Sequence, residues 1–264
     1  IYIRTKLGFV MIKLVDLLNE GVYDKGILKA VFLAGGPGSG KTYAAEGLFG
    51  IPENINLSYT GLKMVNYDQE FEKALEKYGF GTELDAMPDE VFADLTGYDK
   101  KTDKPVKGVH SGLRDYTKSL TKARQKLYEN GRLGMIIDGT GDDYSKIANN
   151  KSRLERIGYD CYMVFVNTSM EVALHRNNNR KRVLPKKLVT DSWHKCQKNI
   201  GRFQGLFKGN IVVIDNSKHL EEDEAKKKFD SLAKTYIDKF VKKPTKNPKG
   251  KNWIRKQKIL KKKK

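Results

Sequence analysis

Five short runs of apolar, often β-branched residues recur along the chain, separated by polar stretches of helix length. Each run is continuously apolar, which is typical of a strand covered on both faces. The runs are Val31–Ala34, Met64–Tyr67, Gly134–Ile137, Cys161–Val166 and Ile211–Ile214. Helices are predicted at 41–49, 69–79, 113–130, 144–157, 169–182, 186–206 and 219–240. This alternation predicts a three-layer α/β fold, in which a five-stranded parallel sheet carries helices on both faces.

One domain from residue 25 to 240 accounts for all of these elements. Residues 1–24 form an extension before it, in which Ile12–Glu20 is predicted to be a short outer helix and Met11 is a candidate start. Residues 82–112 fit neither a strand nor a helix. This insert follows the second strand, near the carboxyl ends where open α/β sheets bind ligands. We therefore expect it to be a loop-rich, substrate-side flap.

The net charge of the 264-residue chain is +19, and most of the excess lies at the C-terminal end. Residues 239–264 contain 13 Lys or Arg and no Asp or Glu. Because they are so polar, residues 241–264 are predicted to be a disordered basic tail. Two functions are open for this tail: a solubilising segment, or electrostatic attachment to nucleic acid with Trp253 as a stacking group.

Composition also excludes several classes of protein. No run approaches the roughly 18 apolar residues that span a bilayer, and the N-terminal stretch lacks a signal-peptide layout. The only cysteines, Cys161 and Cys196, suggest no disulfide framework, and the four histidines show no metal-ligand spacing. These features predict a cytoplasmic protein without a membrane association.

The most specific motif is Gly35-Gly36-Pro37-Gly38-Ser39-Gly40-Lys41-Thr42, directly after the first apolar run. The glycines let successive backbone N–H groups point inward at phosphate oxygens, and the start of the following helix adds positive charge. Lys41 is expected to reach the terminal phosphates, and Thr42 to offer its hydroxyl to Mg²⁺. The motif predicts a P-loop NTPase fold that binds ATP.

Two aspartates follow predicted strands at the same edge of the sheet. Asp68 ends the second strand, from where it could orient or deprotonate an attacking hydroxyl, or simply cap the next helix. Asp138 ends the third strand, a position in which a carboxylate holds the Mg²⁺ shell. The turn Gly139-Thr140-Gly141 comes next, and the Thr140 hydroxyl can point into the cleft toward substrate.

An arginine-rich segment follows the fourth strand. Arg176 and Arg180 are one helical turn apart on the predicted helix 169–182, and Arg182 comes just before Pro185. In kinases, guanidinium groups of a lid spread over the β- and γ-phosphates and stabilise charge during transfer. A solvated helix end is the alternative, because the helix dipole also favours arginine there.

In this order, the motifs resemble those of the zeta-toxin-like P-loop kinases, relatives of polynucleotide and small-molecule kinases. The resemblance covers roughly residues 27–216, and it includes Ile137–Thr140 and the segment Leu154–Asp160. It implies that Lys41 and Thr42 bind ATP and Mg²⁺, that Asp68 is the base, that Asp138 and Thr140 contact metal and substrate, and that Arg176, Arg180 and Arg182 are lid arginines. Asp138 stands where the toxins are expected to carry Glu, and the insert at 82–112 matches no part of the pattern.

The leading hypothesis is therefore an ATP-dependent kinase acting on a hydroxyl of a nucleic acid, a nucleotide sugar or another small molecule. The alternatives are a nucleic-acid-associated ATPase and an ATP-sensing adaptor. A GTPase is not expected because the chain lacks an Asn-Lys-x-Asp element. The sequence identifies neither an inhibitory partner protein nor an oligomeric state.

Overall fold

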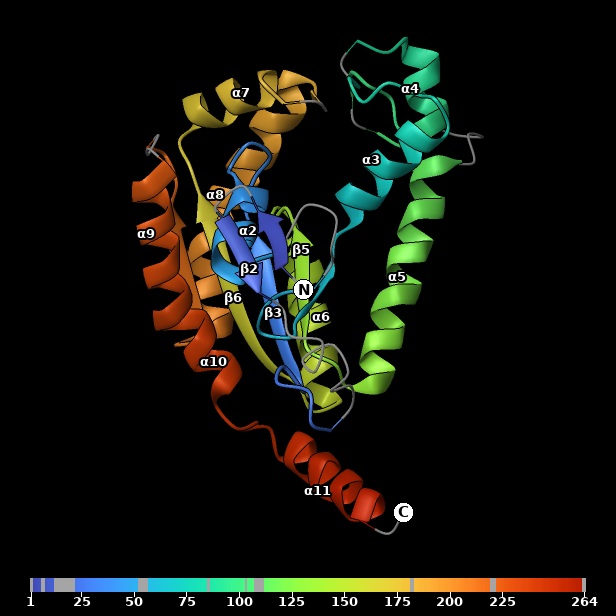
Figure 1. Ribbon diagram of the computed structural model, residues 1–264. Helices are drawn as coiled ribbons and strands as arrows, with labels where there is room; N and C mark the ends of the chain where they lie inside the picture. The colour runs from blue at the N-terminus through green and yellow to red at the C-terminus, as the bar shows by residue number, and fades with distance from the viewer. Residues whose placement is uncertain are drawn as a thin grey trace.

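The computed structural model contains an open sheet of five parallel strands between two layers of helices (Figure 1). The strand order is β4-β5-β3-β6-β7, for β3 (Lys29–Ala34), β4 (Lys63–Val65), β5 (Met135–Gly139), β6 (Asp160–Asn167) and β7 (Ile211–Asp215). All neighbouring pairs are parallel, so the predicted sheet and fold class are confirmed. The structure describes residues 2–5, 8–11, 22–51, 57–84, 86–102, 104–106, 112–180, 183–218 and 222–262.

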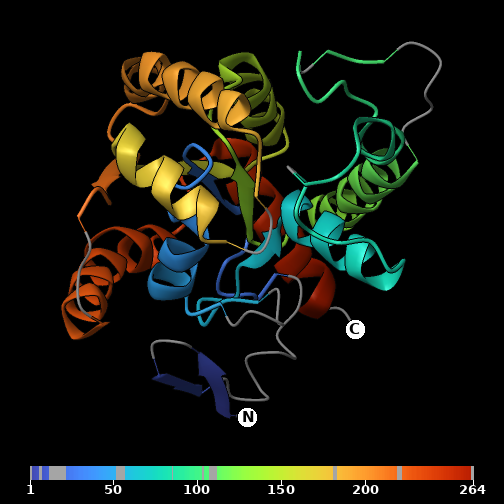
Figure 2. The same ribbon diagram turned by 90° about the horizontal axis from the view of Figure 1, so that it is seen from above.

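The central strand β3 is buried on both sides, because its alternate residues enter different cores. Val31 and Leu33 pack against α2 (Lys41–Phe49), α9 (Glu222–Leu232), the π-helical segment η1 (Ala233–Asp238) and α10 (Lys239–Lys242). Ala30 and Phe32 pack on the other face against α6 (Tyr144–Arg156) and α8 (Lys186–Phe207). Figure 2 shows these layers from above. This double burial explains why the strand sequences are continuously apolar.

A third, smaller core lies beside the sheet. It joins α3 (Tyr67–Lys77), α4 (Asp89–Thr96) and α5 (Leu113–Gly131) through buried residues such as Phe71, Leu75, Phe92 and Leu95. The prediction that residues 82–112 contain no helix is therefore wrong for α4. An eight-residue helix has too little periodicity to be seen in sequence, and this one is stabilised by burying Phe92 and Leu95 against its neighbours.

The N-terminal residues form a separate antiparallel pair, β1 (Tyr2–Thr5) and β2 (Gly8–Met11). The predicted helix at 12–20 falls outside the described residues. Within the described residues, no helix combines the length and apolar character needed to cross a bilayer.

The C-terminal segment is folded, so the prediction that residues 241–264 are disordered is wrong for the described part. Residues 248–262 form α11 (Pro248–Lys262), and Trp253 and Ile254 pack against the core on the α6–α8 face. Asn247 fixes the start of the helix, because its side-chain amide donates to the carbonyls of Glu155 (2.8 Å) and Tyr159 (3.3 Å). The folded domain therefore extends beyond residue 240.

We expect Gly250→Ala to destabilise the protein by about 1–3 kcal/mol, as is usual for an overpacked contact. A Cβ at Gly250 would lie 2.3 Å from the carbonyl oxygen of Gly158, which is backbone and cannot rotate away. The control is Gly201→Ala in α8, where a Cβ would meet nothing within 4 Å; alanine there should be neutral or slightly stabilising. Urea unfolding measures both. Equal stabilities of the two variants would contradict the docking of α11.

Candidate functional site

The predicted phosphate loop connects β3 to α2 at the carboxyl edge of the sheet, and its backbone needs glycine at two positions. Gly38 and Gly40 have φ values of 75° and 85°. A Cβ on Gly38 would lie 2.2 Å from the carbonyl oxygen of Ala173, and one on Gly40 would lie 2.5 Å from the Asn216 amide nitrogen. No side chain caps the N-terminus of α2, so its first N–H groups remain available to an anion.

Lys41 lies across this loop. Its ammonium donates to the carbonyl oxygens of Gly35 (2.7 Å) and Gly36 (3.3 Å). Lys41 and Thr42 both line a cleft of about 730 Å³, together with Pro37, Gly38 and Gly40. Ser39 is buried, whereas Gly36 packs near Trp193 and Cys196 of α8. The loop thus presents a cation and a hydroxyl to the cleft.

Asp138 lies at the carboxyl end of β5, beside Leu33 of β3, and it lines the same cleft. Burial raises the pKa of its carboxyl to about 7; Asp68 also raises this pKa, whereas Lys41 lowers it. Its Oδ1 atom is buried and has no hydrogen-bond partner among the described residues. A buried carboxylate oxygen without a donor is costly unless a cation binds it.

These residues fit a Mg²⁺ ion of the phosphate-bound kind. Mg²⁺ usually takes one or two protein ligands and completes its shell with phosphate oxygens and water. The unpaired Oδ1 of Asp138 and the Thr42 hydroxyl on the cleft wall provide such a pair. The described residues contain no group of three or more His, Cys, Asp or Glu that could hold a metal without a ligand's help.

In the absence of Mg²⁺ and nucleotide, Asp138→Asn should stabilise the protein at pH 8, by about 1–3 kcal/mol. The folded-state pKa is raised from 3.8 to about 7, so the folded protein binds more protons than the unfolded chain between these values. The free energy of unfolding of the wild type should therefore fall as the pH rises from 4 to 7, and the variant should lose this component. Urea unfolding at pH 5 and pH 8 tests it, with the exposed Asp223→Asn as control. A wild-type pH profile in Asp138→Asn would contradict the assignment.

Asp68 lies in the first turn of α3 and lines the cleft. The alternative that Asp68 caps this helix is wrong, because the side chain of Asn66 is the cap and accepts from the Gln69 N–H at 3.1 Å. The charge of Asp68 raises the pKa of Asp138, so the two carboxylates lie within electrostatic range of each other. The cap residue thus leaves the Asp68 carboxylate at the cleft wall.

Thr140 lines the cleft as predicted, but its hydroxyl donates to Oδ1 of Asp142. Asp142 also accepts from the Ser192 hydroxyl at 3.0 Å. The Asn199 amide of α8 donates to the carbonyls of Gly141 (3.1 Å) and Asp142 (2.9 Å). The α8 helix therefore fixes the turn that carries Thr140, and Asp142 is a site residue that we did not predict.

The arginine-rich segment contacts the phosphate loop through Arg176. Arg176, in α7 (Met170–Asn178), donates to the carbonyl oxygens of Asn216 (3.0 Å) and Ser39 (3.4 Å). The predicted helix to residue 182 is wrong in length, because α7 ends at Asn178 with Asn179 as its cap. Arg180 therefore lies beyond the helix, although it lines the cleft with Arg176. Arg182 falls outside the described residues.

Two further residues complete the site and were missed in the sequence. Asn216, after β7, is buried, and its amide donates to the Ser39 carbonyl at 2.9 Å, which ties the phosphate loop to the end of the sheet. Arg114, at the start of α5, lines the cleft; it donates to the Tyr67 hydroxyl (3.1 Å) and stacks over the Tyr98 ring at 4.7 Å. An Asn directly after a strand-end Asp was the available signal for Asn216.

The cleft therefore lies between two walls above the sheet. One wall is formed by the phosphate loop, α7 and the first half of α8, and the other by α3 and α4. Figures 1 and 2 show where these helices lie. The residues Leu84, Phe92 and Thr96 of the insert line the cleft, so the predicted position of the insert on this side is confirmed. The cleft brings together Lys41, Thr42, Asp68, Asp138, Thr140, Arg176 and Arg180.

No protein-family description matches this sequence, and no curated protein matches it. Among solved structures, a candidate kinase from Chloroflexus aurantiacus is similar at 11% identity and a TM-score of 0.46, over 78% of this chain and 98% of that one. A structure from the PezAT toxin–antitoxin system of Streptococcus pneumoniae is similar at 10% identity and a TM-score of 0.43, over 81% of this chain and 88% of that one. Shikimate kinase from Acinetobacter baumannii is similar at 14% identity and a TM-score of 0.41, over 83% of this chain and 98% of that one.

These likenesses are distant, and they concern only the path of the chain. The fold assignment itself comes from the parallel sheet and from the loop between its central strand β3 and α2. The arrangement of this sheet, with the phosphate loop after its central strand, gives the chain the predicted three-layer α/β P-loop NTPase fold.

Proposed function

We propose that the chain is an ATP-dependent phosphotransferase that moves the γ-phosphoryl group of ATP to a hydroxyl of an acceptor. One observation carries this proposal: a phosphate-loop lysine, a partly buried carboxylate and a second carboxylate share one cleft, as Lys41, Asp138 and Asp68. A protein that only senses ATP needs the first two of these groups. A carboxylate such as Asp68 adds a group that can act on the acceptor.

The phosphates of ATP would occupy the loop. The backbone N–H groups of Gly38, Gly40, Lys41 and Thr42 and the Lys41 ammonium would bind them. Arg176, Arg180 and Arg182 would spread positive charge over the β- and γ-phosphates. Thr42 and Asp138 would hold Mg²⁺, which would neutralise charge on the phosphates. The cleft volume of about 730 Å³ leaves room for an acceptor beside the nucleotide.

The acceptor hydroxyl would face Asp68. As the oxygen bonds to the γ-phosphorus, its proton passes to the Asp68 carboxylate, and the bond from this phosphorus to the bridging oxygen breaks to release ADP. Thr140 would contact the acceptor from the turn that α8 fixes. Positioning and electrostatic stabilisation are the main demands of phosphoryl transfer, and these residues supply both.

The acceptor classes are a nucleic-acid 5′-hydroxyl, a nucleotide sugar and another small molecule. The test uses γ-labelled ATP and Mg²⁺ with 5′-hydroxyl oligonucleotides in one pool and nucleotide sugars in another. Label in either pool supports the kinase and identifies the acceptor class. Free phosphate without labelled acceptor would instead support an ATPase, and ATP binding without turnover would support an ATP-sensing adaptor.

A further inference from the structure

Two hollows lie at the amino end of the sheet, away from the cleft. The first, of about 440 Å³, lies between β6, η1, α10 and the segment before α11, and includes Lys239, Lys243 and Lys246. The second, of about 450 Å³, lies along α11 and includes Lys251, Arg255 and Lys258. Both are lined by Pro244, so they adjoin. We call these six basic residues, with the hollows that they line, the basic groove.

The positive charge of the groove is not neutralised within the described structure. Of the two acidic residues that line it, Asp160 accepts from the Lys29 ammonium (2.9 Å) and from two backbone N–H groups, and Glu155 pairs with Lys151 at 2.6 Å. None of the six basic residues forms an ion pair with a described residue. Burial lowers the pKa of Lys29, and the charges of Lys246 and Lys243 lower it further. The three ammonium groups therefore repel one another within the first hollow.

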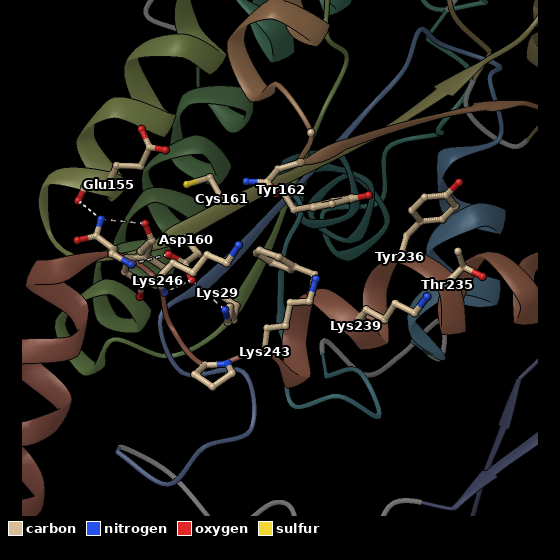
Figure 3. A pocket seen from close by; sticks show the side chains of 16 residues that line it. Lys29, Glu155, Asp160, Cys161, Tyr162, Thr235, Tyr236, Lys239, Lys243 and Lys246 are labelled. Atoms are coloured by element: carbon tan, nitrogen blue, oxygen red, sulfur yellow. Dashed lines mark hydrogen bonds and ion pairs between the residues drawn. The ribbon is translucent and has the colours of Figure 1, made fainter.

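The groove also contains an accessible aromatic ring. Tyr236, which lines the first hollow, is 38% exposed. It lies in η1, and π-helical turns inside α-helices are rare and occur frequently at functional sites. Figure 3 shows Tyr236 and the lysines that line the same hollow. Cations that follow a backbone, combined with an aromatic ring for stacking, are the features with which proteins bind single-stranded nucleic acid.

We propose that the basic groove binds single-stranded nucleic acid through its phosphates. A small phosphate compound needs converging cations, whereas these six extend along the chain from Lys239 in α10 to Lys258 in α11. A membrane surface would need a continuous exposed apolar face along the helix. On α11, Trp253 and Ile254 pack against the core, and the exposed large apolar side chains are confined to Ile259 and Leu260 at its C-terminal end. Lys29 at the start of β3 lines the groove, and the phosphate loop after the end of β3 lines the cleft. The groove and the cleft are therefore roughly 20 Å apart, at a rise of about 3.3 Å per residue.

The binding test needs neither ATP nor an acceptor hydroxyl, so its result is independent of the proposed phosphotransfer. The probe is a labelled 20-nucleotide single strand with a 5′-phosphate, and its anisotropy is followed in EDTA over a range of salt concentrations. The test variant carries Lys239→Gln, Lys243→Gln, Lys251→Gln and Lys258→Gln. The control removes four exposed lysines of α5 and α9 with the same change of charge: Lys122→Gln, Lys126→Gln, Lys226→Gln and Lys227→Gln.

The test variant should bind at least tenfold more weakly at 100 mM salt, and the slope of log K against log salt should fall by about 2–3, at about 0.7 per lost phosphate contact. The control should stay within about twofold of the wild type. Equal losses in the two variants, no binding by the wild type, or binding to phosphatidylserine vesicles without binding to the oligonucleotide would each overturn the proposal. So would displacement of the strand by millimolar inorganic phosphate at constant ionic strength.

A second variant tests the stacking contact. Tyr236→Leu should weaken binding of the single strand by about fivefold or more. Binding of the duplex of the same sequence should not change, because paired bases cannot stack on the ring. Urea unfolding confirms that the variant is folded. An equal effect on the single strand and the duplex would overturn the role of Tyr236.

Discussion

Lys41→Ala should lower the rate of phosphoryl transfer by about a thousandfold or more, which corresponds to roughly 4 kcal/mol of transition-state stabilisation. In the structure, the Lys41 ammonium is held by the Gly35 and Gly36 carbonyls, so it is positioned beside the loop before any phosphate arrives. Alanine removes the only loop side chain that carries a charge, and the N–H groups alone cannot follow the charge that develops on the γ-phosphate.

The measurement is single-turnover transfer from γ-labelled ATP, with the binding of ATP followed separately. Lys73→Ala is the matched control, because Lys73 is an exposed lysine on the other wall of the same cleft. We expect the control to retain transfer within about tenfold. If the transfer rate falls by similar factors in Lys41→Ala and Lys73→Ala, Lys41 acts only through the overall charge of the cleft.

The strands and the loop motif could be predicted because their signals are local. The central strands β3 and β6 are buried on both faces, so their sequences are continuously apolar. Lys41, Asp68 and Asp138 stand at strand or loop ends in a known order. The carboxyl ends of parallel strands meet at one edge, which brought these residues together without further information. For residues at the ends of strands, sequence spacing is therefore sufficient to predict that they share one site.

The C-terminal segment shows the limit of compositional reasoning. Between residues 242 and 262 only Trp253, Ile254, Ile259 and Leu260 are large and apolar, which predicts disorder. The segment is nevertheless fixed by polar and steric contacts: the Asn247 amide on two carbonyls, and the close approach of Gly250 to Gly158. These contacts join residues about 90 positions apart, so neither charge nor periodicity could reveal them.

The same reason explains the site residues that were missed. Arg114 lines the cleft only because α5 begins beside Tyr67, and Asn216 holds the phosphate loop only because β7 ends beside it. The cap of α3 is a local choice between two neighbouring polar residues, and Asn66 rather than Asp68 takes it. That choice has a chemical consequence, because Asp68 lines the cleft and does not cap the helix.

The role of Asp68 leads to the second large effect. Asp68→Asn should reduce transfer to the acceptor by about 10²–10⁴-fold, the usual contribution of a general base, while the binding of ATP stays near that of the wild type. Asparagine keeps the size of the side chain, and the phosphate-binding groups lie on α2 and α7 rather than on α3. The change should therefore affect kcat and not the affinity for nucleotide.

The neighbouring charge provides an independent readout. Asp68 raises the pKa of Asp138, so removing its charge should lower that pKa and shift the pH dependence of stability toward lower pH, even without substrate. Glu72→Gln, one turn further along the same helix and also on the cleft wall, is the matched control and should retain transfer within about fivefold. Asp68 is the base only if its variant alone loses transfer while ATP still binds; transfer within tenfold of the wild type would leave it as an electrostatic neighbour of Asp138.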